Sequence, residues 1–202
     1  MNEQPYLLSR RDAFGVALAA GMVPAFAGLA SAAIAQTRPA TPADPELERR
    51  RHDWDWLVGS WNVRHRRLKE RLTGNTEWEE FDGTSLLWLT LDGLGTVDDN
   101  MLELPAGTYR AVGIRAFDAT TGLWSIWWLD ARSNSIDPPV RGRFEGDSAT
   151  FIGDDMLRGR PVKVRFRWTD IHSAHPHWEQ AFSPDEGATW EVNWRMRFTR
   201  AA

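Results

Sequence analysis

Apolar and polar residues alternate one by one along several stretches of this 202-residue chain, most clearly over residues 162–169 and 190–199. Successive side chains of a β-strand point to opposite faces, so each stretch predicts a strand with one dry and one wet face. Turn-forming pairs such as Gly74-Asn75, Asp82-Gly83 and Gly146-Asp147 recur between such stretches. The spacing predicts about eight to ten short antiparallel strands, as in an all-β barrel or sandwich. No helical run interrupts them, which argues against a parallel sheet.

A single short helix is expected before the first strand. Asp44-Pro45 has the pattern of a helix N-cap followed by Pro at the first helical position. The spacing then predicts one helix over residues 46–57, ended by Gly59. Its apolar stripe would cover part of the strand body, and consists of Leu47, Trp54, Leu57 and Val58.

Gly59-Ser60-Trp61 follows this helix and opens the first strand. The tripeptide resembles the Gly-x-Trp signature of lipocalins and other calycins. The region 52–200 also looks like a bacterial family of exported or cytoplasmic lipocalin-like domains of unknown function, through segments 57–61, 97–100, 124–130 and 178–182. The resemblance implies an antiparallel up-and-down β-barrel and no particular reaction. It also implies that an arginine near the end of the last strand packs on Trp61, with Arg195, Arg197 and Arg200 as candidates.

The first 35 residues differ from the rest of the chain. Arg10-Arg11 precede an uncharged run, residues 13–35, that is rich in Ala and Gly and ends in the small-x-small pattern Ala33-Ile34-Ala35. Ser9-Arg10-Arg11 resembles a twin-arginine export signal, and a general secretory signal is the alternative. A membrane anchor is disfavoured because the run is only weakly apolar.

The chain is therefore expected to contain an export signal peptide over residues 1–35, a linker and the start of the helix over 36–51, and a lipocalin-like barrel over 52–202. Cleavage of the signal would leave a periplasmic or secreted bacterial protein without a membrane attachment.

Charge and composition exclude several functional classes. The chain has 24 basic and 28 acidic residues and a net charge of −4, whereas nucleic-acid binders usually carry a basic surplus. The absence of cysteine excludes disulfides, thiolate nucleophiles and zinc-cysteine sites. The Gly-x-Ser-x-Gly elbow, the phosphate loop and the dinucleotide fingerprint are also absent. The Arg-rich stretch 64–71 is interpreted as a solvated edge strand.

Residues 183–190, with the sequence SPDEGATW, match the Asp-box pattern. We interpret it as a structural hairpin turn, because bonds from its Ser and Asp side chains to the backbone explain the motif without a sugar ligand. Alternation places Trp178, Gln180 and Phe182 on one face of the strand before this turn. The dry face of the next strand should oppose them, so Trp178 and Trp194 are expected close together, with Gln180 in need of a polar partner. The next strand's dry face holds Trp190, Val192, Trp194 and Met196, and the residues expected to face outward are His177, Glu179, Glu191, Asn193 and Arg195.

A second hairpin, 109–117 and 124–130, carries a mixed aromatic and charged face. Small side chains beside large rings leave space, and a few fixed polar groups in an apolar surround are typical of a ligand pocket. The alternative is that this face lies outside and forms a surface ion pair between Arg115 and Asp130. The face consists of Tyr109, Ala111, Gly113 and Arg115 on one strand and Trp124, Ile126, Trp128 and Asp130 on the other.

Candidates for chemistry come from two acidic pairs, Asp98-Asp99 and Asp154-Asp155, and from a histidine cluster. Adjacent strand residues point to opposite faces, so neither pair acts as a dyad by itself. The favoured catalytic candidates are Asp99, Asp154 and Asp130, and Asn100 is a further candidate. His175 and His177 have a spacing that suits a metal, but solvated loop histidines, His172 included, explain the cluster better.

The most favoured function is binding of a small apolar or aromatic ligand in a barrel lined by some of the 12 tryptophans. No cofactor and no nucleic acid are expected, and a homodimer stays open beside a monomer. The alternatives are a cofactor-free enzyme on the same barrel, which uses an Asp as acid or base, and a ligand-free structural domain. The expected ligand-binding residues are Tyr109, Arg115, Trp128, Asp130, Trp178, Gln180, Trp194 and Asn100.

Overall fold

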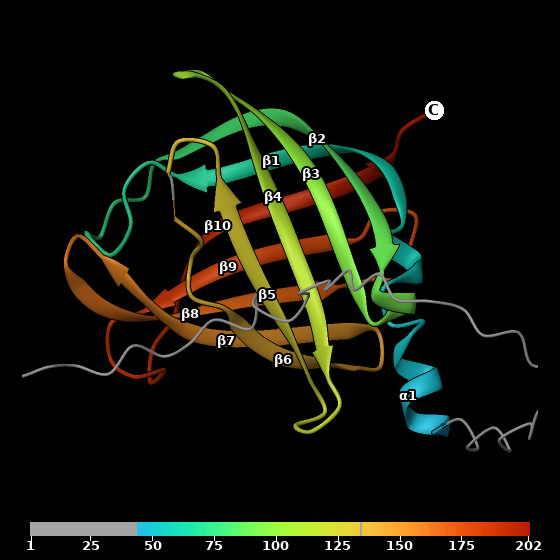
Figure 1. The fold of residues 1–202 in the computed structure, drawn as a ribbon. Helices are drawn as coiled ribbons and strands as arrows, with labels where there is room; N and C mark the ends of the chain where they lie inside the picture. The colour runs from blue at the N-terminus through green and yellow to red at the C-terminus, as the bar shows by residue number, and fades with distance from the viewer. Residues whose placement is uncertain (1–43, 134) are drawn as a thin grey trace, which may run out of the picture. The chain divides into compact units, whose positions relative to one another are not determined.

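A closed antiparallel β-barrel of ten strands forms the body of the molecule in the computed structural model, which describes residues 44–133 and 135–202 (Figure 1). Each strand pairs with the next along the chain, and β10 pairs with β1 to close the barrel. The predicted all-β, up-and-down barrel is therefore confirmed. The expected signal peptide (1–35) and linker (36–43) lie outside the described residues. The strands are β1 Gly59–Leu68, β2 Trp78–Thr90, β3 Gly95–Leu104, β4 Gly107–Asp118, β5 Leu123–Asp130, β6 Val140–Glu145, β7 Ser148–Leu157, β8 Arg160–Thr169, β9 His177–Ser183 and β10 Glu191–Arg200.

The N-terminal helix is shorter than predicted. The α-helix α1 spans Pro45–Arg50, and a separate 3₁₀ turn, η1, spans Asp55–Leu57. Asp44 caps α1 as expected, since its carboxylate accepts a hydrogen bond from the Glu46 amide at 2.9 Å. The continuous helix fails at residues 51–54 because Asp53 is held to the barrel, where its carboxylate accepts a 2.7 Å hydrogen bond from Trp124 Nε1.

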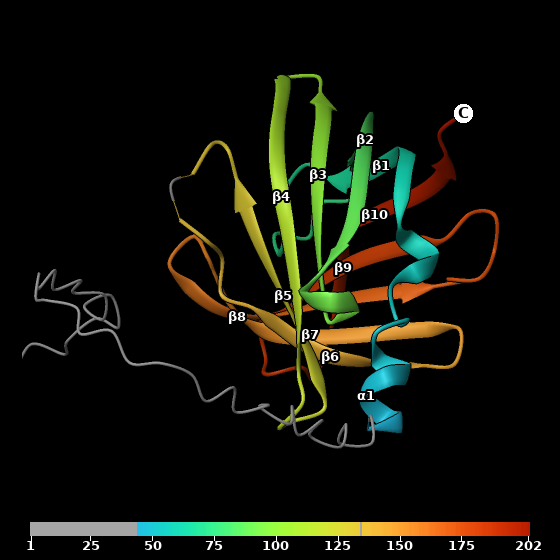
Figure 2. The same ribbon diagram turned by 45° about the vertical axis from the view of Figure 1, so that its right-hand side comes forward.

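The break in the helix places Trp54 inside one end of the barrel. Trp54 is completely buried, as is Trp124, and its ring lies 4.9 Å from Phe144 and 5.9 Å from Phe151 between centroids. Trp168 lies edge-on to it at 6.3 Å. The apolar stripe thus does cover part of the strand body, as predicted. We call these five rings the aromatic floor, because they pack together inside the barrel next to η1, which Trp54 precedes. Figure 2 shows α1 beside the barrel strands.

Trp61 and Arg200 form the contact that the calycin resemblance implies. The Arg200 guanidinium carbon lies 3.9 Å from the centroid of the Trp61 ring, and Arg200 Nη2 donates to the Trp56 carbonyl at 2.8 Å. Gly59, with φ +108°, gives the arginine room, since a Cβ there would lie 2.9 Å from Arg200 Nη1. Arg200 is thus the one of the three candidate arginines that packs on Trp61.

A β-bulge in β10 overturns part of the predicted strand face. Val192 pairs with Ala181 and Trp194 with Gln180, so Asn193 is the extra residue. Asn193 is fully buried rather than facing outward, and the bulge reverses the alternation before it. Glu191 is consequently half-buried instead of solvated, and accepts a 2.8 Å hydrogen bond from the Leu72 amide. The predicted common face of Trp190, Val192 and Trp194 is therefore wrong.

The outer surface of the barrel keeps some apolar side chains. Leu86 and Trp88 on β2 are 48% and 45% exposed, and Leu91 in the 3₁₀ turn η2 (Leu91–Gly93) is 63% exposed. In the described part of the chain, no helix has the length and apolarity needed to cross a membrane.

Candidate ligand-binding cavity

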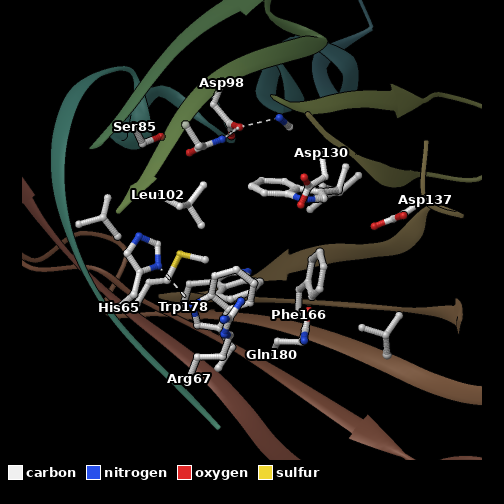
Figure 3. A pocket seen from close by; sticks show the side chains of 18 of the residues that line it. His65, Arg67, Ser85, Asp98, Leu102, Asp130, Asp137, Phe166, Trp178 and Gln180 are labelled. Carbon is white, nitrogen blue, oxygen red and sulfur yellow. Dashed lines mark hydrogen bonds between the residues drawn. The ribbon is translucent and has the colours of Figure 1, made fainter. Parts of the chain in front are cut away.

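A cavity of about 620 Å³ occupies the barrel interior above the aromatic floor. The buried residues Leu57, Trp168 and Phe198 line it beside the floor, and the more exposed Arg71, Asp137 and Asp155 line the part that we call its mouth. Figure 3 shows side chains from opposite walls pointing into one space, with Asp98 and Ser85 across from Trp178 and Gln180. The barrel is therefore hollow on one side of its aromatic floor.

The inner face of the second hairpin is the mixed face, not the all-apolar one. Register pairs Gly113 with Trp128 and Arg115 with Ile126, and all four of these residues line the cavity. The residues expected to bind a ligand, namely Tyr109, Arg115, Trp128, Asp130, Trp178, Gln180, Trp194 and Asn100, all line the same cavity. Their position in the wall is what a binding role requires; the binding itself stays a prediction.

Arg115 pairs with Asp98, a partner that the sequence did not single out. Arg115 Nη1 lies 2.5 Å from Asp98 Oδ2, and the two residues are only 6% and 4% exposed. Asp98 also accepts hydrogen bonds from Asn100 Nδ2 at 2.6 Å and from the Gly113 amide at 2.8 Å. A Cβ at residue 113 would lie 2.4 Å from Asp98 Oδ1, so only glycine leaves room for the carboxylate.

Arg115 and Asp130 do not form the surface ion pair of the alternative interpretation. Register places Asp130 opposite Ala111, which lies two residues from Gly113 and four residues from Arg115 along β4. Asp130 instead forms a 2.6 Å ion pair with Arg132. The hydrogen bond from Arg132 lowers the pKa of the Asp130 carboxyl, which suits a permanent charge at the mouth better than a proton donor.

In both acidic pairs, the member facing the cavity is not the one favoured from the sequence. Asp99 points outward and pairs with Arg110, whereas Asp98 points inward. The Asp154 side chain is 82% exposed and lies 2.5 Å from Lys163 Nζ, whereas Asp155 lines the cavity. Neither catalytic candidate, Asp99 or Asp154, therefore reaches the interior.

The wall opposite Asp98 is aromatic and has one buried amide pair. Trp178 and Trp194 meet edge-on at 5.9 Å, as predicted, and Phe166 lies 5.0 Å from Trp178. Gln180 finds its polar partner in the bulged residue, because Gln180 Nε2 donates to Asn193 Oδ1 at 2.8 Å. The bulge thus satisfies the amide that lies among the rings.

His65 on β1 is a cavity residue that the sequence analysis missed. It continues the alternation of Trp61 and Val63 along β1, and this alternation could have predicted that His65 faces the interior. Trp194 Nε1 donates to His65 Nδ1 at 3.2 Å, and the imidazole stacks on Phe81 at 4.6 Å. Burial, with Arg67 as a lesser cause, lowers the pKa of His65 from its ordinary 6.5 to about 3. The ring is therefore neutral and carries its proton on Nε2, a hydrogen-bond donor in the cavity wall.

This histidine makes a testable contribution to the pH dependence of stability. Between pH 6.5 and about pH 3 the unfolded chain binds a proton at residue 65 that the folded chain does not. The free energy of unfolding should therefore fall as the pH is lowered through this range, by at most about 1.4 kcal/mol per pH unit. Urea denaturation of the wild type and of His65→Gln at pH 7, 6 and 5 measures it. The variant should show a flatter dependence, and parallel curves would contradict the assignment.

The Arg-rich stretch does not form an edge strand, because the barrel is closed. Arg67 on β1 faces inward, and its Nε donates a 2.9 Å hydrogen bond to Glu79 Oε1. Arg71, in the β1–β2 loop, also lines the cavity. Of the basic residues in this stretch, only Arg64, Arg66 and Lys69 are exposed as predicted.

The side chains of the histidine cluster and of the Asp-box form hydrogen bonds with neighbouring protein groups. His175 Nδ1 lies 3.2 Å from Thr199 Oγ1 and His177 Nδ1 lies 3.1 Å from Asp170 Oδ2. Among the described residues, no group of three or more His, Cys, Asp or Glu side chains could hold a metal ion. In the Asp-box turn, Asp185 accepts hydrogen bonds from the Thr189 amide and hydroxyl at 2.8 and 2.6 Å, which confirms its structural interpretation.

Comparison of the sequence with protein-family models and with curated proteins finds no match. The fold and the cavity therefore carry the functional argument.

Proposed function

We propose that this protein binds a small apolar or aromatic molecule inside its barrel. The observation that carries the proposal is the cavity itself: about 620 Å³, closed at one end by the aromatic floor and lined by both rings and polar groups. Ligand pockets for small molecules commonly have volumes of about 300–1,000 Å³ and this mixture of side chains.

The chemistry of the wall supports an aromatic or aliphatic ligand. Trp128, Trp178, Trp194 and Phe166 offer ring surface to the cavity, and a ligand that covers such surface gains roughly 25 cal/mol for each Å² removed from water. The polar side chains are already fixed by one another, as in the Gln180–Asn193 and Asp98–Arg115 pairs. They can therefore orient a ligand without being reorganised by it.

The two alternative functions have less support. A ligand-free structural barrel needs an interior filled by its own side chains, and this interior has room for a small molecule. An enzyme that uses Asp99, Asp154 or Asp130 on a bound substrate needs that carboxylate in the cavity, and Asp99 and Asp154 lie on the outer surface. Asp130 does line the cavity, but its hydrogen bond from Arg132 lowers the pKa of its carboxyl, which disfavours it as a proton donor or acceptor at neutral pH.

Family membership and export of the chain are part of the same proposal. We infer membership of the lipocalin-like family from the Gly59-Ser60-Trp61 signature and its Arg200 contact. Export to the periplasm or the medium through a cleaved signal is inferred from residues 1–35. Mass spectrometry of the processed protein, first native and then denatured, tests both the cleavage and any ligand retained through purification.

Filling the cavity tests the binding proposal. Ser85 is buried on the inner face of β2, so Ser85→Trp should place an indole in the cavity and abolish binding of N-phenyl-1-naphthylamine, a neutral aromatic fluorophore. Leu86→Trp is the matched control, because the neighbouring residue faces outward and is 48% exposed. Fluorescence titration should show binding to the wild type and to Leu86→Trp alone. Equal binding by all three proteins would place the fluorophore outside the barrel and contradict the proposal.

A further inference from the structure

Arg71 brings a positive charge to the mouth of the cavity without an ion-pair partner among the described residues. Its guanidinium carbon lies 5.5 Å from the centroid of Phe182 and 5.8 Å from that of Trp194, both of which line the cavity. By contrast, Arg67 is bound to Glu79, and Arg132 is bound to Asp130. Arg71 therefore differs from the other arginines of the mouth.

The carboxylates nearest to Arg71 are engaged elsewhere. Glu191 accepts the Leu72 amide at 2.8 Å, and this bond fixes the loop that carries Arg71. Asp155 accepts the amide of Met156 at 2.6 Å. Both carboxylates act on Arg71 only at longer range, and neither comes within ion-pair distance.

The charge of Arg71 is correspondingly under-compensated. Burial lowers the pKa of its guanidinium to about 10, and the like charge of Arg67 adds to the effect. An anion placed beside this guanidinium would regain the interaction that water no longer supplies. The aromatic faces of Phe182 and Trp194 hold the guanidinium by cation–π contact, which leaves its N–H edges free to donate.

A phenol lies in the same part of the mouth. Tyr109 is 8% exposed, and burial raises the pKa of its hydroxyl, while Arg132, Arg67 and Arg71 act in the opposite direction. Its hydroxyl is therefore protonated at neutral pH, and is a second donor near the two inward-facing arginines.

We propose that the ligand is an amphipathic anion, whose apolar body lies among the cavity rings and whose carboxylate, sulfonate or phosphate group is bound by Arg71. The proposal rests on the proposed binding function and specifies the charge of the ligand and its orientation. Asp137 and Asp155 also line the mouth, so the interaction of the anionic group with Arg71 must outweigh repulsion from these two carboxylates. Because Arg71 lies at the mouth, the acidic group stays there, and the apolar end enters first.

A matched pair of fluorophores tests the charge preference. N-phenyl-1-naphthylamine is neutral, and 8-anilino-1-naphthalenesulfonate has the same rings with one sulfonate. In Arg71→Gln, the dissociation constant of the sulfonate should rise about ten- to a hundredfold, the usual effect of losing a hydrogen bond to a charged group. That of the neutral fluorophore should change less than about twofold. Arg66→Gln removes the same charge from an outward-facing position of β1 and should affect neither fluorophore.

The outcomes separate this inference from the function on which it rests. If the neutral fluorophore binds in the cavity but Arg71→Gln changes both affinities equally or neither, the anion site is refuted and the binding function stands. If neither fluorophore binds the wild type, or Ser85→Trp leaves both affinities intact, both proposals fail. An equal loss in Arg66→Gln and Arg71→Gln would show general charge attraction and would also overturn the assignment to Arg71.

Discussion

Replacing Asp98 with alanine should lower the free energy of unfolding by about 3–5 kcal/mol, the usual cost of leaving a buried charge without its partner. Arg115 would remain 6% exposed with no carboxylate beside it, and the Gly113 amide and the Asn100 side chain would each lose an acceptor. Urea denaturation followed by circular dichroism measures the change.

The adjacent residue provides the control for this substitution. Asp99 pairs with Arg110 on the outer surface, where an ion pair contributes at most about 1 kcal/mol. Asp99→Ala should therefore be nearly neutral, although it removes the same side chain one position along β3. A double variant, Asp98→Leu with Arg115→Met, should be more stable than Asp98→Ala, because it leaves no unpaired charge inside. Equal effects of Asp98→Ala and Asp99→Ala would show that the buried pair is energetically unimportant.

Removing the indole of Trp54 should cost a similar amount, about 3–5 kcal/mol, for a different reason. Trp54 is completely buried and contacts the other four rings of the aromatic floor, so Trp54→Ala leaves a hole between them. Its Nε1 has no hydrogen-bond partner among the described residues, so the loss comes from ring packing and from the contact with Arg115, whose guanidinium carbon lies 4.6 Å from the Trp54 ring centroid. Trp54→Phe, which keeps a ring in place, should be much less destabilising. Thermal and urea unfolding measure both variants.

Trp88 is the matched control for Trp54. It is 45% exposed on the outer face of β2, so Trp88→Ala should change the free energy of unfolding by less than about 1 kcal/mol. A comparable loss from Trp54→Ala and Trp88→Ala would contradict the view that the floor is a packed element of the barrel.

The alternation of residue types was sufficient to predict the antiparallel strands and to group much of the inner wall, whereas the choice of a barrel over a sandwich came from the resemblance to calycins. A period of two assigns residues of one strand to a common face, so Trp178 and Gln180, or Gly113 and Arg115, could be grouped correctly. The same rule, applied from Val63 onward, also places His65 inside. In β4 and β5, both faces carry apolar side chains. A period of two does not predict which face of such a strand is the inner one.

Three features of the site depend on information that is absent from a local pattern. The choice between Asp98 and Asp99 is set by Arg115 and Gly113 on the neighbouring strand, that is, by register between strands. The inward turn of Asn193 is set by a bulge, which shifts the alternation by one residue and is visible only against the partner strand β9. The position of Arg71 is set by its loop, where the Leu72 amide is tied to Glu191 more than a hundred residues away.

The aromatic floor blocks one end of the barrel, and under the proposed binding function this has a kinetic consequence. A bound ligand would leave by the route through which it entered. Its residence time would therefore depend on the loops at the mouth of the cavity and not on the barrel strands. Substitutions in those loops can retune uptake and release while the ten-stranded frame stays unchanged. If the proposed binding function holds, the protein would retain its ligand and release it at the same end, and would not conduct it through the barrel.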